Sequence, residues 1–300
     1  MSMPNFFIIG APKCGTTAMS VYLGRHPEIF ISKPKEPHFF ATDFPAHQQV
    51  TDETNYQNCF REKNESQKLI GDGSALYLRS EVAVPKIMNR IPYAKFIVMF
   101  RNPVDMAYSM HGQAFYDGDE DEPDFEKAWH LQTQRMNGIS RPKKCRDHRV
   151  LQYSKLCKLG EQSVRLLENA PRLQIYPVFF DEFIADTETV YRGVCEFLDV
   201  DSLQGNCKFE PVNSAKRARS PGLNRFLRAP SPWISSVTAK VKQSFGIENI
   251  ELLRPLRALN RIAPPQKQLS TEFTNVLREH FYKDVRLLEE LWDKKTKWCE

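Results

Sequence analysis

The chain has 300 residues, 41% of them hydrophobic and 11% aromatic, with a formal net charge of +5. This length and apolar content suffice for an α/β domain with a substantial core. The mild positive charge suits an anionic ligand but lacks the concentrated basic stripe of a nucleic-acid-binding protein. No stretch approaches the ~18 consecutive apolar residues of a membrane span, and no leader-like segment precedes the apolar run at Asn5. We therefore expect a soluble, cytoplasmic protein that binds no nucleic acid.

A glycine-rich loop follows the first apolar run. Residues 5–9 (NFFII) indicate a strand that ends at Gly10, and apolar residues recur at helical spacing after Thr16. Strand, glycine loop and helix are the order of a phosphate-binding loop. A Walker A loop places its lysine directly after the second glycine, Gly15. Here Thr16 holds that position and the lysine, Lys13, lies inside the loop.

Two further strands are predicted at residues 94–100 and 172–183, each followed by a helix. Alternating strands and helices indicate an α/β fold with a central parallel sheet flanked by helices. Ligands of such sheets bind beyond the carboxyl ends of the strands, where the P-loop-like loop lies. Arg101 ends the strand that, in a Walker protein, would end in a metal-binding Asp. Since an arginine binds a phosphate but no metal, the sequence predicts a site for two anions without metal.

The seven cysteines are odd in number and scattered, with no C-x-x-C pair and no zinc spacing. We interpret them as reduced thiols. Cys14 lies inside the glycine loop, where a nucleophilic thiol is conceivable, but no His or Asp stands near it in the sequence. We therefore favour a packing role for the Cys14 side chain.

The rest of the chain gives weaker signals. Residues 220–268 are rich in Pro, Arg and Ser and predict an irregular, flap-like insertion. Residues 269–300 predict a docked helix with a buried stripe at Phe273, Leu277, Phe281, Val285, Leu288 and Leu291. We expect one domain over residues 1–300. The sequence carries no signal for an oligomeric state.

Two segments carry a resemblance to a known family. Residues 8–19 (IIGAPKCGTTAM) and 96–110 (FIVMFRNPVDMAYSM) resemble the signatures of sulfotransferases that use 3′-phosphoadenosine 5′-phosphosulfate (PAPS) and release 3′-phosphoadenosine 5′-phosphate (PAP). The resemblance is to the glycan-modifying and bacterial members. It implies that Arg101 and Ser109 bind the 3′-phosphate. It also implies that the 5′-phosphosulfate is bound by Lys13, Cys14, Gly15, Thr16, Thr17 and Ala18.

Later segments extend the resemblance. Residues 151–160 (LQYSKLCKLG) are similar to a family segment whose tyrosine, here Tyr153, approaches the nucleotide. Residues 212–220 (VNSAKRARS) resemble a basic loop that closes over the phosphates, which implies roles for Arg217 and Arg219.

Sulfuryl transfer needs a base for the acceptor proton and positive charge for the departing phosphate. Lys13 is predicted to stabilise the leaving group. Residues 32–40 (SKPKEPHFF) resemble the family's K-E-x-H-F-F segment, which implies that Glu36 is the base and His38 its polar partner. We expect Phe39 and Phe40 to bury Glu36. His111 is the rival base.

The acceptor is less well defined. Residues 116–125 contain six carboxylates, which would attract a cationic acceptor if they border its cleft. An acidic segment without substrate contact, paired with the basic run at 141–149, is at least as consistent. Many glycan-modifying members of the family carry a lysine at the position that corresponds to Gly73, and its absence here weakens the case for a glycan acceptor. We predict a small acceptor, neutral or cationic, with a hydroxyl or an amine, and keep a glycan as the alternative. A P-loop kinase and a non-catalytic nucleotide-binding module are remote alternatives.

Overall fold

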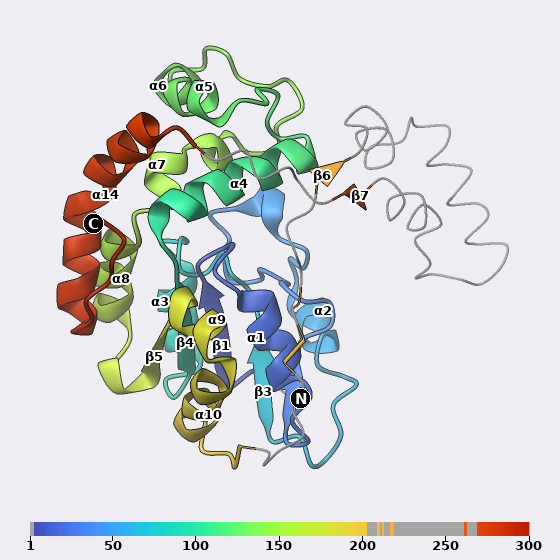
Figure 1. Ribbon diagram of the computed structural model, residues 1–300. Helices are drawn as coiled ribbons and strands as arrows, with labels where there is room; N and C mark the ends of the chain where they lie inside the picture. The colour runs from blue at the N-terminus through green and yellow to red at the C-terminus, as the bar shows by residue number, and fades with distance from the viewer. Residues whose placement is uncertain are drawn as a thin grey trace, which may run out of the picture. The chain divides into compact units, whose positions relative to one another are not determined.

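The computed structural model describes residues 3–202, 209–210, 212, 217–218, 261–262 and 269–299 (Figure 1). The chain divides into two compact units. Unit 1 consists of Met1–Ala107, Ser154–Asn213 and Ser270–Glu300, and unit 2 of Tyr108–Tyr153 and Ser214–Leu269. Within the described part of the chain, no helix combines the length and apolar character that crossing a bilayer requires. The assignment of residues 1–300 to one domain stays a prediction.

Unit 1 contains a five-stranded sheet in the order β2-β3-β1-β4-β5, and all its pairings are parallel. The strands are β1 (Phe6–Gly10), β2 (Ile29–Ile31), β3 (Leu69–Asp72), β4 (Lys95–Phe100) and β5 (Ile175–Phe179). The predicted α/β fold is confirmed, and the three predicted strands correspond to β1, β4 and β5. The strand predicted at 172–183 forms only over Ile175–Phe179, because a helix begins at Phe180. β2 and β3 were not predicted because they have only three and four residues, too few for a strand pattern to stand out in the sequence.

The strand order changes direction at β1. β3 pairs with one side of β1, where Phe7 faces Asp72, and β4 pairs with the other side, where Gly10 faces Val98. After β1 the chain forms β2 and β3 on one side of β1, and it then crosses to the other side to form β4 and β5. Ligands of open α/β sheets bind at such a switch point, outside the carboxyl ends of the strands.

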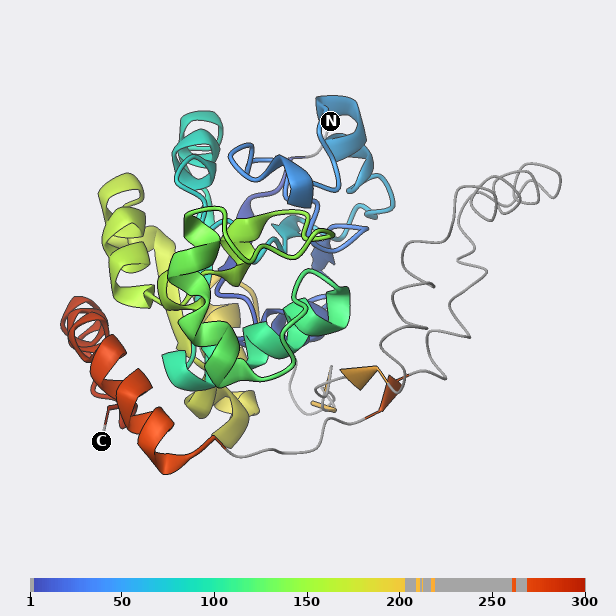
Figure 2. The ribbon, with the colours of Figure 1, turned by 90° about the horizontal axis from the view of Figure 1, so that it is seen from above.

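Helices of unit 1 form two contact groups (Figures 1 and 2). α1 (Thr16–Leu23) contacts α10 (Thr187–Phe197), which also contacts α9 (Phe180–Ala185). α8 (Leu159–Asn169) contacts α3 (Ala83–Arg90) and α14 (Thr271–Trp292). The shorter elements are η1 (Pro45–His47), α2 (Glu53–Asn58), α7 (Tyr153–Leu156) and η3 (Arg172–Gln174).

The C-terminal helix α14 buries the predicted stripe from Phe273 to Leu288. At its last turn Trp292 is buried, whereas Leu291 is only half-buried. The Trp292 indole donates a hydrogen bond to Ser163 Oγ on α8 (3.1 Å), which anchors the end of the helix.

Unit 2 begins within α4 (Pro103–Asp117) and contains α5 (Phe125–His130), α6 (Gln132–Met136) and η2 (His148–Leu151). A two-residue strand β6 (Arg217–Ala218) pairs antiparallel with β7 (Arg261–Ile262). The predicted insertion at 220–268 lies outside the described residues, apart from β7.

Candidate active site

The loop after β1 presents backbone N–H groups to an anion. Gly15 is the N-cap of α1 and has the left-handed φ of 90°. The amides of the first helical turn, from Thr16 onward, have no acceptor within the helix, and the helix dipole adds positive potential there. Lys13 lies in the same loop, also in the left-handed region with φ 66°. Together these groups make an anion-binding turn.

Close packing requires both glycines of this loop. A Cβ on Gly10, whose φ is 143°, would lie 2.7 Å from the carbonyl oxygen of Ala75. A Cβ on Gly15 would lie 3.2 Å from the Phe180 ring. The loop is also tied to β4, because the Ala11 amide donates to the Met99 carbonyl oxygen (2.5 Å).

Arg101 follows β4 directly and contacts the glycine loop. Its Nη1 donates to the carbonyl oxygen of Lys13 (3.0 Å), and its guanidinium carbon lies 4.8 Å from the centroid of the Phe180 ring. The Nε atom is buried and has no hydrogen-bond partner among the described residues. Because buried donors are normally satisfied, this arrangement fits an anion bound beside the loop. The structure thus places Arg101 in contact with the backbone of Lys13.

Glu36 and His38 lie in a segment of irregular backbone. Both have positive φ, 64° and 54°. Glu36 Oε1 forms an ion pair with Lys35, and its Oε2 lies 3.9 Å from His38 Nε2. The Glu36 side chain is 34% exposed, so the expected burial by its aromatic neighbours is wrong. The Phe39 ring instead stacks on Tyr56 with 4.3 Å between centroids.

The imidazole of His38 is almost buried. Burial lowers the pKa of His38 to about 4, although the Glu36 carboxylate acts to raise it. His38 is therefore neutral at pH 7, and its buried Nδ1 has no hydrogen-bond partner among the described residues. A neutral imidazole can orient Glu36 by hydrogen bonding but supplies no positive charge.

Three predicted residues lie in unit 2. Tyr153 is fully buried and its hydroxyl donates to Glu120 Oε2 (2.7 Å), so it packs inside the unit. His111 is also buried; its Nε2 bonds the Glu122 carbonyl oxygen (2.8 Å), and burial lowers its pKa. Ser109 lies in the second turn of α4. Of the two arginines in the basic loop, Arg217 belongs to β6 and Arg219 lies outside the described residues.

The acidic segment at 116–125 is largely engaged within unit 2. Glu120 is fully buried and bonds Arg135 through both oxygens (2.5 and 2.6 Å). Asp119 is buried and pairs with Arg146 (2.5 Å). Asp124 caps α5. The basic run at 141–149 therefore does pair with the acidic segment, through Arg146. Two of the six carboxylates of the acidic segment, those of Asp119 and Glu120, are buried.

The Cys14 thiol is fully buried, with its Sγ 3.9 Å from Met106 Sδ. Burial raises the pKa of Cys14 to about 12, although Arg101 acts to lower it. The thiol is therefore protonated at neutral pH and is no nucleophile. Within the described ranges, no group of three or more His, Cys, Asp or Glu residues could hold a metal ion.

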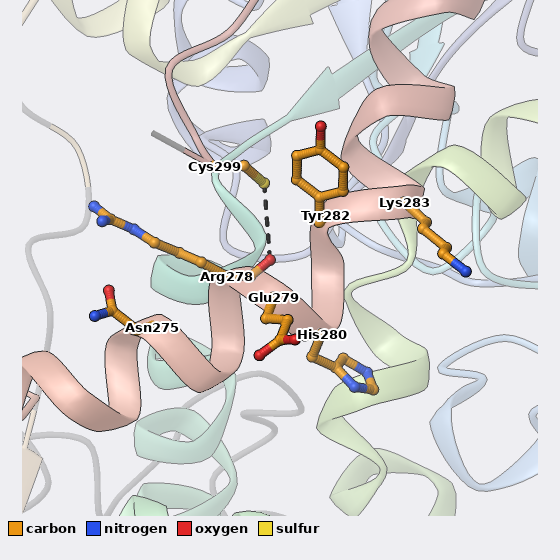
Figure 3. A pocket seen from close by; sticks show the side chains of 7 residues that line it. All are labelled: Asn275, Arg278, Glu279, His280, Tyr282, Lys283 and Cys299. Carbon is orange, nitrogen blue, oxygen red and sulfur yellow. Dashed lines mark hydrogen bonds between the residues drawn. The ribbon is translucent and has the colours of Figure 1, made fainter.

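A separate cavity lies along α14 and the C-terminal Cys299, whose Sγ is 3.9 Å from the Arg278 carbonyl oxygen (Figure 3). None of its lining residues is a predicted site residue. They are Asn275, Arg278, Glu279, His280, Tyr282, Lys283 and Cys299.

Fold and site define an α/β protein with a P-loop-like turn and an arginine on the neighbouring strand, arranged to bind anions. The family described as "Sulfotransferase domain" matches residues 3–222, so the chain belongs to this family of sulfotransferases. A crystal structure of a sulfotransferase from Alicyclobacillus acidocaldarius is similar over 100% of both chains, with a TM-score of 0.69 and 23% identity. That similarity shows the fold.

Curated relatives match shorter regions. The membrane-associated sulfotransferase kil1 of Dictyostelium discoideum is 30% identical over 113 residues, 37% of this chain and 23% of that protein. The human bifunctional heparan sulfate N-deacetylase/N-sulfotransferase 2 is 33% identical over 121 residues, 39% of this chain and 14% of that protein. The chain thus matches less than a quarter of the length of either relative.

Proposed function

We propose that the protein transfers the sulfuryl group of PAPS to a hydroxyl or an amine of an acceptor. The observation that carries the proposal is Arg101, whose buried Nε has no partner among the described residues and whose Nη1 contacts the glycine loop. Two cationic elements thus end neighbouring strands, as a donor with separate 5′ and 3′ phosphate groups requires. When bound, PAPS would supply the activated sulfuryl group.

The glycine loop would hold the 5′ end of the donor. Its free first-turn amides, the Thr16 and Thr17 hydroxyls and the Lys13 ammonium would neutralise charge on the departing phosphate. Arg101 would hold the 3′-phosphate, with Ser109, Arg217 and Arg219 as further predicted contacts. No metal is needed for these roles.

Glu36 would accept the proton of the attacking hydroxyl or amine. Its carboxylate is partly exposed, so an acceptor can reach it, and its ion pair with Lys35 keeps it in place. Neutral His38 lies beside Glu36 Oε2 and would orient it through a hydrogen bond once the two approach.

A small molecule, neutral or cationic, and a glycan are the two acceptor candidates. The case for a cationic acceptor rested on the acidic segment, and the burial of Asp119 and Glu120 weakens it. A glycan is supported by the relative whose name assigns it heparan sulfate N-sulfotransferase activity. The absence of a lysine at Gly73 still favours the small acceptor.

Donor binding is tested by calorimetric titration with PAP in EDTA, against ATP with magnesium. We expect metal-free PAP binding that weakens about 10- to 100-fold in Arg101→Ala, since hydrogen bonds to charged groups contribute about 1.5–3 kcal/mol. Arg61→Ala, which alters an exposed arginine, is the matched control. Tighter binding of ATP with magnesium would refute the proposal.

Catalysis is tested by release of PAP from PAPS in the presence of an acceptor panel. Phenols, alkylamines and a polysaccharide with free amino groups distinguish the two acceptor candidates. In Glu36→Gln we expect unchanged PAP affinity and turnover reduced at least ~100-fold. Unchanged turnover would remove Glu36 from the mechanism, and a protein that binds PAP but never turns over would be a binding module.

A further inference from the structure

The segment that carries Glu36 has an unusual backbone that other residues must hold in place. Positive φ at non-glycine residues costs about 1–3 kcal/mol each and persists only where the surroundings impose it. Glu36 and His38 both have this conformation, with only Pro37 between them. The residues that hold the backbone here therefore also decide where the Glu36 carboxylate lies.

Two side-chain hydroxyls accept hydrogen bonds from the backbone of this segment. The His38 amide donates to Ser74 Oγ (3.0 Å), and the Phe40 amide donates to the Tyr77 hydroxyl oxygen (3.3 Å). Ser74 and Tyr77 are both buried and follow β3 in the chain. Each hydroxyl must direct a lone pair at the amide and its own proton elsewhere.

Both hydroxyl protons are directed at Asp72, the last residue of β3. Ser74 donates to Oδ1 (2.6 Å) and Tyr77 to Oδ2 (2.9 Å). A third hydroxyl, that of Tyr56, also donates to Oδ2 (2.8 Å). An ionised carboxylate only accepts hydrogen bonds, so it fixes the direction of all three.

Asp72 is well placed to act as this fixed point. It is fully buried and lies opposite Phe7 of the central strand β1. Burial raises the pKa of Asp72 to about 6, while the three hydroxyls and the Lys35 ammonium act to lower it. Asp72 is thus still largely ionised near neutral pH.

We propose that Asp72 is a positioning residue for Glu36, acting through the hydroxyls of Ser74 and Tyr77 that hold the backbone of residues 36–40. The catalytic part of this inference rests on the proposed function, in which Glu36 is the base. Asp72 touches neither the Glu36 carboxylate nor any reacting atom. Its effect is therefore on the placement of the base, and donor binding does not depend on it.

The two tyrosines offer a matched pair of variants. Both are fully buried and both donate to Asp72 Oδ2, but only Tyr77 accepts a bond from the 36–40 backbone. Tyr77→Phe removes the acceptor of the Phe40 amide. Tyr56→Phe removes one bond to Asp72 and keeps the ring that stacks on Phe39. Asp72→Asn keeps one acceptor oxygen and replaces the other by an NH2 group, which donates but cannot accept.

The experiment measures turnover, PAP affinity and amide hydrogen exchange of residues 38–41 in these three variants. We expect Asp72→Asn and Tyr77→Phe to lower kcat at least ~10-fold, since small displacements of a catalytic group have large effects on rate. PAP affinity and the KM for PAPS should stay within about twofold, and exchange at 38–41 should accelerate. Tyr56→Phe should change kcat and exchange much less.

Equal effects of the two tyrosine variants would overturn the proposal, because they would reflect the loss of one buried hydrogen bond to Asp72, which both variants share, and not the loss of the bond from the Phe40 amide. Unchanged exchange and unchanged kcat in Tyr77→Phe would also overturn it. If the unmodified protein neither binds PAP nor turns over PAPS, the proposed function fails by itself. Hydrogen exchange then still decides whether Asp72 and Tyr77 hold the segment.

Discussion

The ring of Phe180 packs against the guanidinium of Arg101, with 4.8 Å between the guanidinium carbon and the ring centroid. The same ring lies against the Gly15 turn, so one aromatic side chain supports both predicted anion-binding elements. The C-terminal tail fixes this corner, because the Trp298 indole donates to Asp181 Oδ2 (2.6 Å), next to Phe180.

Phe180→Leu should weaken PAP binding about fivefold, since a cation–π contact of this kind contributes about 1 kcal/mol. Calorimetric titration with PAP measures the effect. Phe180→Tyr keeps the ring and serves as the control, with affinity close to that of the unmodified protein. Equal affinity of the Leu variant would show that Arg101 does not depend on the ring.

Gly15→Ala should damage both stability and PAP binding. The new Cβ would lie 3.2 Å from the Phe180 ring and 3.3 Å from Met99 Cε, on a residue with φ 90°. We expect a loss of about 1–2 kcal/mol in unfolding free energy and at least ~10-fold weaker binding.

Gly112→Ala is the matched control for that substitution. Gly112 lies inside α4, and nothing lies within 4 Å of its added Cβ. Alanine should stabilise the helix there by up to about 1 kcal/mol. Thermal unfolding compares the two variants. If the Gly15→Ala variant were as stable as the Gly112→Ala variant, the glycine loop would be able to accommodate the added Cβ without strain.

The sequence predicted the parts of the site that follow from local pattern. Apolar runs that end in Gly10 and Arg101 indicated strands whose ends carry polar residues, and the structure places those ends on neighbouring strands. The support that Phe180 gives to both loops could not be predicted. It depends on the pairing of β4 with β5, which joins residues far apart in the chain.

The residues around Glu36 show the same division. The K-E-x-H-F-F resemblance located Glu36 and His38, but the expected aromatic burial of Glu36 was wrong. Two residues apart on an irregular backbone can point in unrelated directions, and only the tertiary position of Tyr56 shows where the Phe39 ring goes. The hydrogen bonds of Asp72 with Tyr56, Ser74 and Tyr77 could not be predicted from the sequence, because these residues come from separate elements and follow no recognised spacing.

His38 should contribute to acid instability. Its folded-state pKa, about 4, lies below the usual 6.5, so the unfolded chain binds more protons between those pH values. Stability from neutral His38 is present above pH 6.5 and is lost as the pH falls toward 4, by about 3 kcal/mol in total. Asp72 works in the opposite sense, since its raised pKa favours the folded state on acidification.

Urea unfolding of the unmodified protein and His38→Gln, from pH 7 to pH 4, separates the two groups. The free energy of unfolding is plotted against pH for each protein, and the difference between the two plots reports His38 alone. We expect this difference to become smaller as the pH falls. His130→Gln, at an exposed histidine, is the control for replacing a histidine elsewhere in the chain. Parallel curves for the unmodified protein and His38→Gln would contradict a depressed pKa for His38.

We expect the Glu120 carboxylate to stabilise unit 2 and to play no part in attracting a cationic acceptor. It bonds Arg135 through both oxygens, and also accepts from the Tyr153 hydroxyl (2.7 Å) and the amides of Asp121 and Glu122 (both 2.9 Å). Although burial acts to raise the pKa of Glu120, the bonds from Arg135 and its other donors lower it. The carboxylate is therefore ionised and satisfied. Glu120→Gln would leave the fully buried Arg135 charge with only the more distant, exposed Asp121 carboxylate as an ion-pair partner.

We expect Glu120→Gln to destabilise unit 2 by about 3–5 kcal/mol, the usual effect of breaking a buried ion pair. Faster amide exchange within residues 108–153 measures it. Asp121→Asn is the control: its side chain is 60% exposed and lies 3.5 Å from Arg135, so exchange should barely change. If Asp121→Asn instead raised the KM for a cationic acceptor several-fold, the acidic segment would contact that acceptor through its exposed carboxylates after all.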